Sequence, residues 1–329
     1  MPQPTTNAVH VDTPLTQISI AFMQKQRNFI ADRVFPVVSV SKQSDRYYTY
    51  DRGFFNRDEL KVRAPGTESA GVAYEVDNTP TYYCPIYAGH HDIADEVRDN
   101  ADSVLNLNQE AAELLALKAL LKKENLWAAE YFVGGVWTND YDGVSGAPST
   151  NEAKHWSDAA STPIEDIRAA KTAVLQETGF EPNTLVIGQE VLDALVDHPD
   201  IVDRVKYGQT AGSPADPDLQ ELASLFKVER ILVMKAIKNT AAEGATNAHS
   251  FIGGKKALLC YSAPAPGLMT PSAGYTFAWT GYRGAAGMGQ RISRMRLDTI
   301  RSDRVELEMA FEHKLIAADL GFFWDSIVA

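Results

Sequence analysis

The stretch NLNQEAAELLALKALLKKENLWAAEYFVGG, residues 106–135, carries the strongest secondary-structure pattern in the chain. Asn106 and Gln109 have the spacing of a capping box, and Gly134-Gly135 ends the pattern. Between them, apolar side chains recur at intervals of three and four: Leu107, Ala111, Leu114, Leu117, Leu121, Ala128 and Phe132. The pattern predicts a helix of about 27 residues and about 40 Å. A helix this much longer than average indicates a structural spine.

The region before this helix is rich in aromatic residues, with nine of the chain's 31 aromatic side chains between residues 47 and 87. Two short β-prone runs, residues 47–50 and 72–76, flank a polar stretch in which Pro65-Gly66 is a turn pattern. The sequence therefore predicts a long hairpin. Because an isolated two-stranded hairpin is only marginally stable in water, we expect this one to rest on a neighbour.

The first 45 residues have the composition of an arm and not of a domain. Residues 1–14 contain three prolines and few apolar side chains, which favours extended or disordered chain. An apolar, β-prone segment follows, which includes Phe29-Ile30 and residues 34–38. It has no partner close by in the sequence, so we expect it to be buried elsewhere, with another chain as one candidate.

The region after the long helix begins with residues 134–162, which are rich in Gly, Ser, Thr, Asn and Asp and predict a loop or linker. Helices and strands then alternate, which predicts a small sheet covered by helices. Helices are expected over residues 162–179, 191–205 with a break at Pro199, and 219–226; strands are expected over residues 185–187, 228–234, 256–261 and 275–279.

The last 40 residues return to β structure. Val305, Leu307, Met309 and Phe311 alternate with three glutamates and one alanine, which predicts a half-buried antiparallel strand. A turn over residues 301–304 precedes it, and residues 291–300 form a further expected strand.

The composition limits the classes of function. The 329 residues are 45% hydrophobic and 22% charged, which is typical of a folded protein with one or two cores. With 31 basic and 43 acidic residues the formal charge is -12, so a generic nucleic-acid binder is disfavoured. Two cysteines, Cys84 and Cys260, are too few for a disulfide scaffold or a multi-cysteine zinc module. No apolar run approaches the length of a membrane-spanning helix, so no membrane partner is expected.

The motif His90-His91-Asp92 is the first candidate for chemistry, because these residue types bind metals. The two histidines are adjacent and no third lies nearby, whereas zinc ligands are spaced so that three converge. A polar loop that enters the long helix is therefore the preferred interpretation.

Other motifs are weaker. The loop with Gly284, Gly287 and Gly289 lacks the following helix that a dinucleotide site requires, and a loop at a subunit contact is preferred. Residues 253–256, GGKK, lack the spacing of a phosphate loop and predict a hairpin turn. Ser145 does not fit a nucleophile elbow. We expect no catalytic residue, no metal ligand and no cofactor.

Arginine is concentrated in the late strands, where six fall within 22 residues of an otherwise acidic chain: Arg283, Arg291, Arg294, Arg296, Arg301 and Arg304. Ion pairing between subunits explains this concentration, since the guanidinium fork suits interface carboxylates. A solvated strand face explains it equally well.

The order of these parts resembles the major capsid proteins of tailed double-stranded DNA bacteriophages, which have the Hong Kong 97-type fold. The closest match in pattern is in residues 18–52, especially NFIADRVFP at 28–36 and KQSDRY at 42–47. RAPG at 63–66 and residues 82–107 are also similar. The resemblance spans nearly the whole chain and is most specific in the first 135 residues.

The resemblance implies an α+β capsid fold in several parts. Residues 1–45 would be an N-terminal arm, and residues 46–92 an extended β-hairpin loop lying over an adjacent subunit. Residues 93–154, with the spine helix, would form a peripheral domain completed by returning strands in residues 290–329. Residues 155–289 would form an α/β axial domain, with the last dozen residues packed against it. The implied function is a structural, non-enzymatic subunit that self-assembles as hexamers and pentamers into an icosahedral shell enclosing double-stranded DNA.

The resemblance also implies partners. These are copies of the chain, a separate scaffolding protein, a portal protein and the enclosed DNA, bound without sequence specificity; a decoration protein is a further candidate. The implied location is the virion, after assembly in the cytoplasm of the bacterial host. Candidate subunit contacts are the six arginines above and the hairpin residues Tyr47, Tyr48, Phe54, Phe55, Arg57, Asp58, Glu59, Lys61 and Arg63.

The sequence departs from some relatives in two respects. The arm starts within about 15 residues of Met1, so we expect no fused scaffolding segment. Some relatives cross-link a hairpin lysine to a late asparagine; Lys61 fits the lysine, but no asparagine follows Asn247, so we expect a shell without isopeptide bonds. Because acidic subunits repel one another, salt should favour assembly.

A cellular encapsulin-type compartment is the alternative with the same fold, and a metal-dependent hydrolase using His90, His91 and Asp92 is the alternative from another class.

Overall fold

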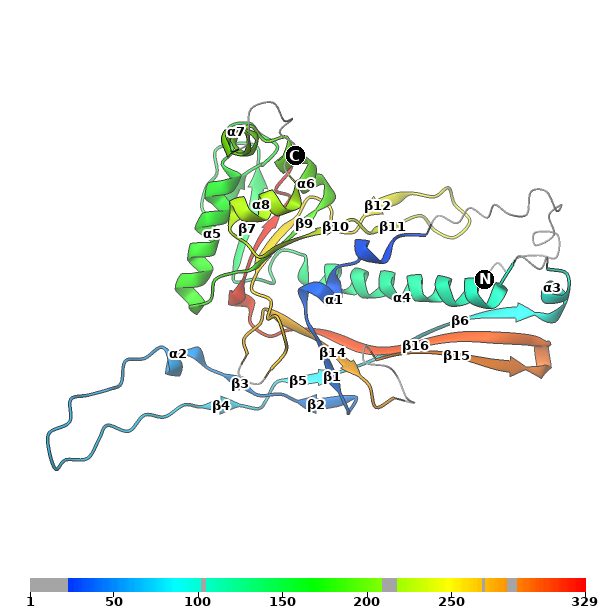
Figure 1. Cartoon of the computed structure of the whole chain (residues 1–329), viewed down its shortest axis with the longest axis horizontal. Coiled ribbons are helices and arrows are strands. Elements are labelled where there is room, and N and C mark those ends of the chain that lie inside the picture. Colours follow the sequence, from blue (N-terminus) through cyan, green and yellow to red (C-terminus); the bar gives the residue numbers. More distant parts are fainter. Residues whose placement is uncertain (1–22, 102–104, 209–217, 268–269, 283–288) are drawn as a thin grey trace.

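The computed structural model describes residues 23–101, 105–208, 218–267, 270–282 and 289–329. An α/β body carries two extensions that point in opposite directions (Figure 1). One is the long helix with a ribbon of strands beneath it, and the other is the hairpin.

The long helix is α4, Leu107–Tyr131, which confirms the predicted spine. The Asn106 side chain accepts a hydrogen bond from the Gln109 amide at 3.2 Å, as the capping-box spacing predicts. The predicted apolar face is partly wrong, since Leu114 is 40% exposed. The buried positions are Ala111, Leu115, Ala119, Lys123, Glu124, Trp127 and Tyr131. Two charged side chains on the buried face are the reason why apolar spacing alone missed it.

A five-stranded sheet lies against α4 (Figure 1). Its strand order is β1-β14-β16-β15, and β6 also pairs with β16. The strands are β1 (Val37–Val40), β6 (Ile86–Ala94), β14 (Gly274–Trp279), β15 (Gln290–Leu297) and β16 (Ser302–Leu315). The alternation predicted for β16 is confirmed, because Val305, Leu307, Met309 and Phe311 are all buried in a cluster with α4. The turn before β16 lies earlier than expected, at η3 (Asp298–Ile300) and Arg301.

The α/β body is built on a six-stranded sheet of order β10-β9-β13-β17-β7-β8. The strands are β7 (Asn139–Val144), β8 (Glu152–Lys154), β9 (Thr184–Gly188), β10 (Arg230–Met234), β13 (Ala257–Cys260) and β17 (Gly321–Asp325). The neighbouring pairs β10–β9, β17–β7 and β7–β8 are parallel, and β13 is antiparallel to both β9 and β17.

The helices of the body are α5 (Pro163–Thr178), α6 (Gln189–Val196), α7 (Pro199–Gly208) and α8 (Leu219–Phe226), as predicted. Three other expectations need correction. The predicted loop over residues 134–162 contains β7 and β8, whose polar and glycine residues hide their strand character. The strand expected over residues 275–279 is β14, which belongs to the other sheet. Residues 253–256 form a turn that enters β13, but β12 (His249–Phe251) before it pairs with β11 (Ile237–Asn239) and not with β13.

Strand β17 joins the two large cores. Phe322 and Trp324 face a cluster formed with α5, α6 and α8, whereas Phe323 faces the cluster that contains Trp127 and Phe132 of the spine region. The expectation that the last dozen residues pack against the α/β part is therefore confirmed.

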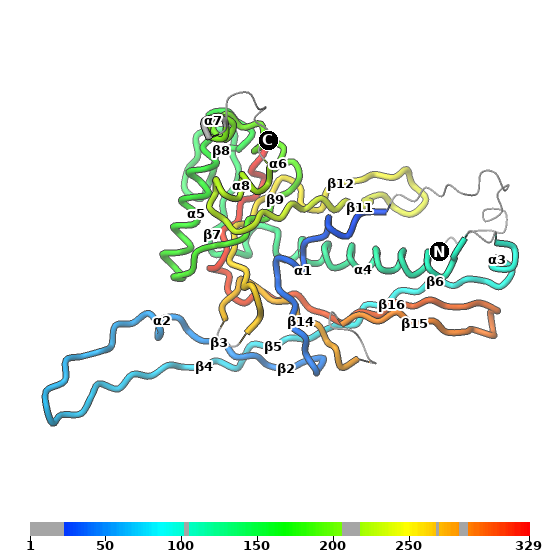
Figure 2. Tube along the Cα trace, in the orientation of Figure 1, coloured from blue at the N-terminus to red at the C-terminus, as the bar shows by residue number. Residues whose placement is uncertain are grey.

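The described part of the arm comprises η2 (Gln26–Asn28), α1 (Ala31–Val34) and β1. The η2 part lies between α4 and the β11–β12 ribbon, and the chain then passes α1 and runs on to β1, which pairs with β14 (Figure 2). Ile30, Val34 and Phe35 are fully buried, with the Phe35 ring 5.7 Å from that of Trp127. The apolar segment is thus buried on its own chain, and the candidate burial on another chain is wrong for these residues. The expected extended or disordered chain over residues 1–14 lies outside the described residues.

The hairpin extends away from the body on the side opposite α4 (Figure 1). Its paired strands are β2 (Ser44–Arg46) with β5 (Thr81–Tyr83) and β3 (Thr49–Tyr50) with β4 (Val76–Asp77), followed on the first limb by α2 (Arg52–Phe55). The remaining short elements are α3 (Asp95–Asp99) and η4 (Ala318–Leu320). In the ranges that the structure describes, no helix has both the length and the apolar character to cross a membrane.

Candidate assembly surfaces

The base of the hairpin is fixed to the five-stranded sheet. Tyr82 is 7% exposed and stacks on Phe277 of β14, with ring centroids 4.6 Å apart, and Tyr47 contacts the same ring at 5.7 Å. The Tyr83 amide donates to Glu312 Oε2 of β16 at 2.8 Å. Of the predicted contact residues, Tyr47 is thus largely used within its own chain.

Beyond its base the hairpin has little support from the described part of its own chain, apart from an ion pair between Arg52 and Asp319 of η4. All side chains from residue 51 to 79 are exposed except Phe54 and Glu59, which are half-buried. No backbone hydrogen bond joins the two limbs between residues 51 and 75. An extended loop of this kind, without a core and without paired strands, has little intrinsic reason to hold one shape.

Large apolar side chains concentrate on this unsupported part. Tyr50, Phe55 and Tyr74 form what we call the hairpin aromatic cluster, with ring centroids 6.0–6.2 Å apart. Phe55 is 51% exposed and Tyr74 63%. Tyr48, Leu60, Val62 and Val72 are also exposed. Sequence reasoning selected Tyr48, Phe54 and Phe55 but missed Tyr50, Tyr74, Leu60 and Val62, although the alternation of Leu60 and Val62 with Lys61 and Arg63 was a usable pattern. An apolar surface of this extent on a folded chain indicates an interaction site.

The hairpin tip carries charges of both signs. Arg57 pairs with Glu59 at 3.3 Å and lies over the Phe54 ring, 5.5 Å from its centroid. Asp58, Lys61 and Arg63 are exposed and make no ion pair with the part of the chain that the structure describes. These three charges remain available for a partner.

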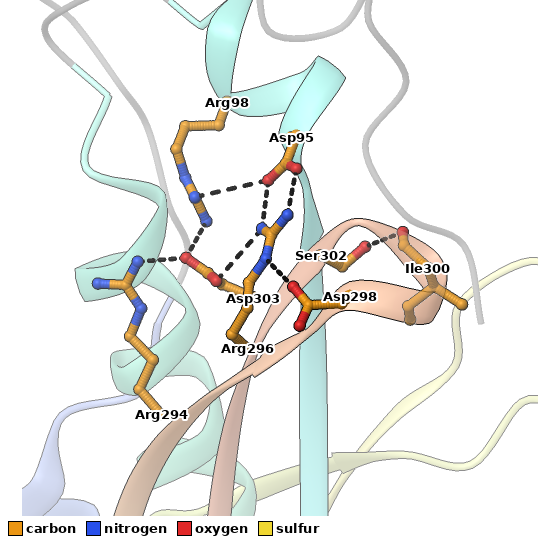
Figure 3. Close-up of polar contacts among 8 residues, drawn as sticks. All are labelled: Asp95, Arg98, Arg294, Arg296, Asp298, Ile300, Ser302 and Asp303. Carbon is orange, nitrogen blue, oxygen red and sulfur yellow. Dashed lines mark hydrogen bonds and ion pairs between the residues drawn. The ribbon is translucent and has the colours of Figure 1, made fainter.

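The arginines of the late strands meet acidic residues from much earlier in the sequence (Figure 3). Asp303 is 5% exposed and is contacted by Arg294, by Arg98 at 2.7 Å and by Arg296 at 3.5 Å. Arg296 also pairs with Asp95 at 2.5 Å. The hydrogen bond from Arg294 and the charge of Arg98 hold the pKa of Asp303 below its usual value. This group fixes the β15–β16 turn to α3.

The remaining arginines differ from one another. Arg304 donates two hydrogen bonds of 2.7 Å to Asp92 of β6. Arg291 and Arg301 have no ion pair within the described ranges, and Arg283 lies outside them. Neither of the two explanations given for the arginines foresaw that Arg294, Arg296 and Arg304 are paired inside their own chain. Arg294 pairs with Asp303 across the β15–β16 turn, whereas Asp95 and Asp92 lie about 200 residues away from Arg296 and Arg304, so only the fold brings those two pairs together.

The residues considered for metal chemistry are part of β6, and the polar loop expected for them is wrong. Because side chains alternate along a strand, His91 points to the opposite face from His90 and Asp92. The Asp92 carboxylate already accepts two hydrogen bonds from Arg304. Across residues 23–101, 105–208, 218–267, 270–282 and 289–329, no group of three or more His, Cys, Asp or Glu side chains could hold a metal ion.

A buried serine–histidine pair has the residue types of a nucleophile and base. Ser161 Oγ lies 3.1 Å from His198 Nε2. However, the Ser161 hydroxyl donates to the Asp158 carbonyl, and His198 Nδ1 accepts from the Asp200 amide. Nε2 therefore carries the imidazole proton and donates to Ser161, so His198 is not placed to act as a base. Burial also raises the pKa of both Cys84 and Cys260 to about 12, which keeps these thiols protonated.

The spine helix, the strand ribbon, the α/β body and an exposed hairpin together define a shell subunit of the Hong Kong 97-type fold. Two relatives and three solved structures are similar over most of the chain. The major capsid proteins of Pseudomonas phage JBD67 and Burkholderia phage BcepMu are 28% and 24% identical over 97% and 96% of each chain.

The solved structures share the fold at low identity. They are a phage-related protein from Bordetella bronchiseptica (TM-score 0.68, 21% identity, 92% of this chain and 93% of that one), the capsid of cyanophage P-SCSP1u (0.60, 14%, 95% and 92%) and an encapsulin complex from Synechococcus elongatus (0.55, 12%, 96% and 95%). The model of the family described as phage major capsid protein E matches residues 89–277, more than half of the chain. The chain belongs to this family and is a structural capsid subunit of a phage.

Proposed function

We propose that copies of the chain assemble as hexamers and pentamers into an icosahedral shell that encloses double-stranded DNA, each subunit laying its hairpin over an adjacent one. The observation that carries this proposal is the hairpin itself, whose base is fixed while its aromatic cluster and its three free charges have no partner elsewhere among the described residues. Contacts between unlike surfaces close into rings when the rotation between subunits fits five or six copies. The negative charge suits a container that encloses DNA by closure, without binding its sequence.

The parts of the chain receive roles in this proposal. Residues 1–45 form the arm, residues 46–92 the extended loop, residues 93–154 the peripheral domain, and residues 155–289 the axial domain around the ring axes. Residues 290–329 provide the returning strands of the peripheral domain and the C-terminal strand β17, which joins the axial sheet. The membership of β7 and β8 in the six-stranded sheet favours moving the start of the axial part to about residue 134. The membership of β14 in the five-stranded sheet favours ending the axial part before residue 274.

We infer the partners and the location from the same assembly. A separate scaffolding protein would direct the shell, a portal protein would occupy one vertex, a decoration protein is a further candidate, and assembly would take place in the host cytoplasm. The subunit would have no enzymatic activity. The proton on His198 Nε2 supports this, because it leaves the imidazole unable to accept a proton from Ser161. The encapsulin-type alternative has the support of the fold alone.

The charges at the hairpin tip provide the test of this proposal. Replacing both Arg57 and Arg63 by glutamate is expected to reduce the yield of shells at least tenfold, because each replaces a favourable contact with repulsion across the interface. The same variant should unfold in urea within about 0.5 kcal/mol of the unchanged chain, since both side chains are exposed. Electron microscopy and sedimentation give the yield. The double change Lys235→Glu and Lys238→Glu is a matched charge reversal off the hairpin, because both side chains are exposed and neither has an ion pair within the described ranges. Normal assembly of the variant with Arg57 and Arg63 replaced would remove the tip from the interface.

The absence of an asparagine after Asn247 predicts shells without covalent links between subunits. Particles boiled in denaturant are expected to run as a single band at the mass of one chain. Lys61→Arg should leave that pattern unchanged, because no bond forms at Lys61. A ladder of multimers that disappears in Lys61→Arg would contradict this prediction.

A further inference from the structure

The contact between the arm and the spine helix contains a buried carboxyl group. Glu124 of α4 is 0% exposed, and its Oε2 atom accepts hydrogen bonds from the amides of Ile30 and Ala31, both at 2.9 Å. These two amides open helix α1, so one side chain of the spine helix satisfies the first free donors of the arm. The position of the arm thus depends directly on the state of Glu124.

The second oxygen of Glu124 has no hydrogen-bond partner. Asp32 Oδ1, two residues beyond Ile30, is also buried and unpartnered. Both side chains line one cavity of about 450 Å³. A buried acceptor atom without a hydrogen-bond donor is costly. A single proton on one of these two carboxyl groups would turn an unsatisfied oxygen atom into a donor.

The charges around Glu124 do not neutralise it. On α4, Lys123 pairs with Asp32 at 3.0 Å and lies over the Phe311 ring, which leaves Asp32 as its principal partner. From the arm, Asp32 faces the cavity together with Arg27 and Arg33, both of which are exposed to solvent. From β16, His313 lies close to Asp32 and Lys123. Burial raises the pKa of Glu124 to about 7, with a small contribution from Asp32, and outweighs the hydrogen bonds from the Ala31 and Ile30 amides, which lower it.

We propose that Glu124 is a proton-linked latch that holds the arm on the spine helix when it is protonated and loosens the arm when it ionises. A proton on Oε1 converts one of the two unsatisfied oxygens into a donor, while Oε2 keeps accepting from the arm amides. Loss of the proton leaves the buried Glu124 carboxylate without a cation of its own, because Lys123 pairs with Asp32. The inference concerns the folded subunit, so it stands or falls independently of hexamers, pentamers and the hairpin contact.

The direction of the pH dependence follows from linkage. The pKa of Glu124 is higher in the docked state, about 7, than its ordinary value of 4.5, so protonation stabilises docking. This stabilisation is complete below pH 4.5 and is lost as the pH rises through 7. His313 acts in the opposite direction, because burial lowers its pKa from 6.5 to about 4. Its neutral form stabilises the folded chain above pH 6.5, and this stabilisation is lost as the pH falls toward 4. Any effect of His313 between pH 6 and pH 8 therefore opposes the fall expected from Glu124 and is shared by a variant that lacks only the Glu124 carboxyl group.

Hydrogen exchange of the full-length chain tests the latch. After correction for intrinsic exchange rates, the protection of amides in residues 29–35 is expected to fall about tenfold between pH 6 and pH 8, with most amides of α5 unaffected. Glu124→Gln keeps an oxygen acceptor for the Ile30 and Ala31 amides but does not titrate, so its protection should be flat over this range. Glu113→Gln, an exposed position on the same helix, should retain the tenfold change.

Either of two results would overturn the latch. One is protection of the arm in the unchanged chain that does not vary between pH 6 and pH 8. The other is a pH profile in Glu124→Gln that follows the unchanged chain. If Glu124→Gln does not fold, the profile of the unchanged chain still decides, because the first result needs no variant.

Discussion

Replacing Phe323 by alanine is expected to lower the free energy of unfolding by about 3–5 kcal/mol, the usual range for a large aromatic side chain removed from a core. Phe323 is 0% exposed and lies on β17, between β13 and β7. Its ring meets Phe132 edge-on, with centroids 5.5 Å apart, so the change leaves a cavity where the α/β body meets the spine helix. Because β17 also contributes Phe322 and Trp324 to the opposite face, a disturbed strand weakens both cores.

Urea unfolding of the unassembled subunit, followed by circular dichroism, measures this effect. Phe251→Ala is the matched control, since Phe251 is 40% exposed on the β11–β12 ribbon and should change the free energy of unfolding by less than about 1 kcal/mol. A loss below about 1 kcal/mol in Phe323→Ala as well would mean that β17 is not part of the folding core.

The elements that the sequence predicted correctly are those whose own residues supply the reason for the structure. Helix α4 has its cap at Asn106, and the alternate apolar residues of β16 from Val305 to Phe311 all lie in the cluster with α4. Strands β7 and β8 were missed because the NDYDGV run of β7 has no β propensity of its own; pairing with β17 and β8 makes it a strand. The same limit applies to the candidate surfaces. The acidic partners of Arg296 and Arg304 lie in α3 and β6, and no local pattern links them.

The arm and the hairpin both carry large apolar side chains, but these side chains are buried in the arm and exposed in the hairpin. The arm places Ile30, Val34 and Phe35 in a core of its own subunit, whereas the hairpin leaves Phe55 and Tyr74 in solvent. The sequence predicted that neither segment has a partner close by in the sequence. Whether a segment is buried in its own subunit depends on whether the chain leads it back to a core. The arm returns along α4, while the hairpin extends away from every core (Figure 1). Removing a ring should therefore weaken folding at Phe35 and assembly at Phe55.

The double change Phe55→Ala and Tyr74→Ala is expected to raise the concentration of free subunit in equilibrium with shells by a factor of about 30 or more. Aromatic side chains at the centre of an interface commonly contribute about 2 kcal/mol each, and about 1.4 kcal/mol corresponds to a tenfold change in affinity. The free energy of unfolding should change by less than about 1 kcal/mol, because these rings contact only one another and Tyr50.

One comparison makes this last prediction specific to the hairpin. Phe180→Ala removes an equally large side chain that is 40% exposed beside the α/β body, and should leave the free-subunit concentration within about threefold of the unchanged chain. Light scattering and size-exclusion chromatography over a range of protein concentrations give both values. If the double variant assembled at the same concentration as Phe180→Ala, the aromatic cluster would lie outside the subunit contact. The exposure of its rings would then need a partner other than a second copy of the chain, because solvent alone gives no reason to gather three aromatic rings at the end of an unsupported loop.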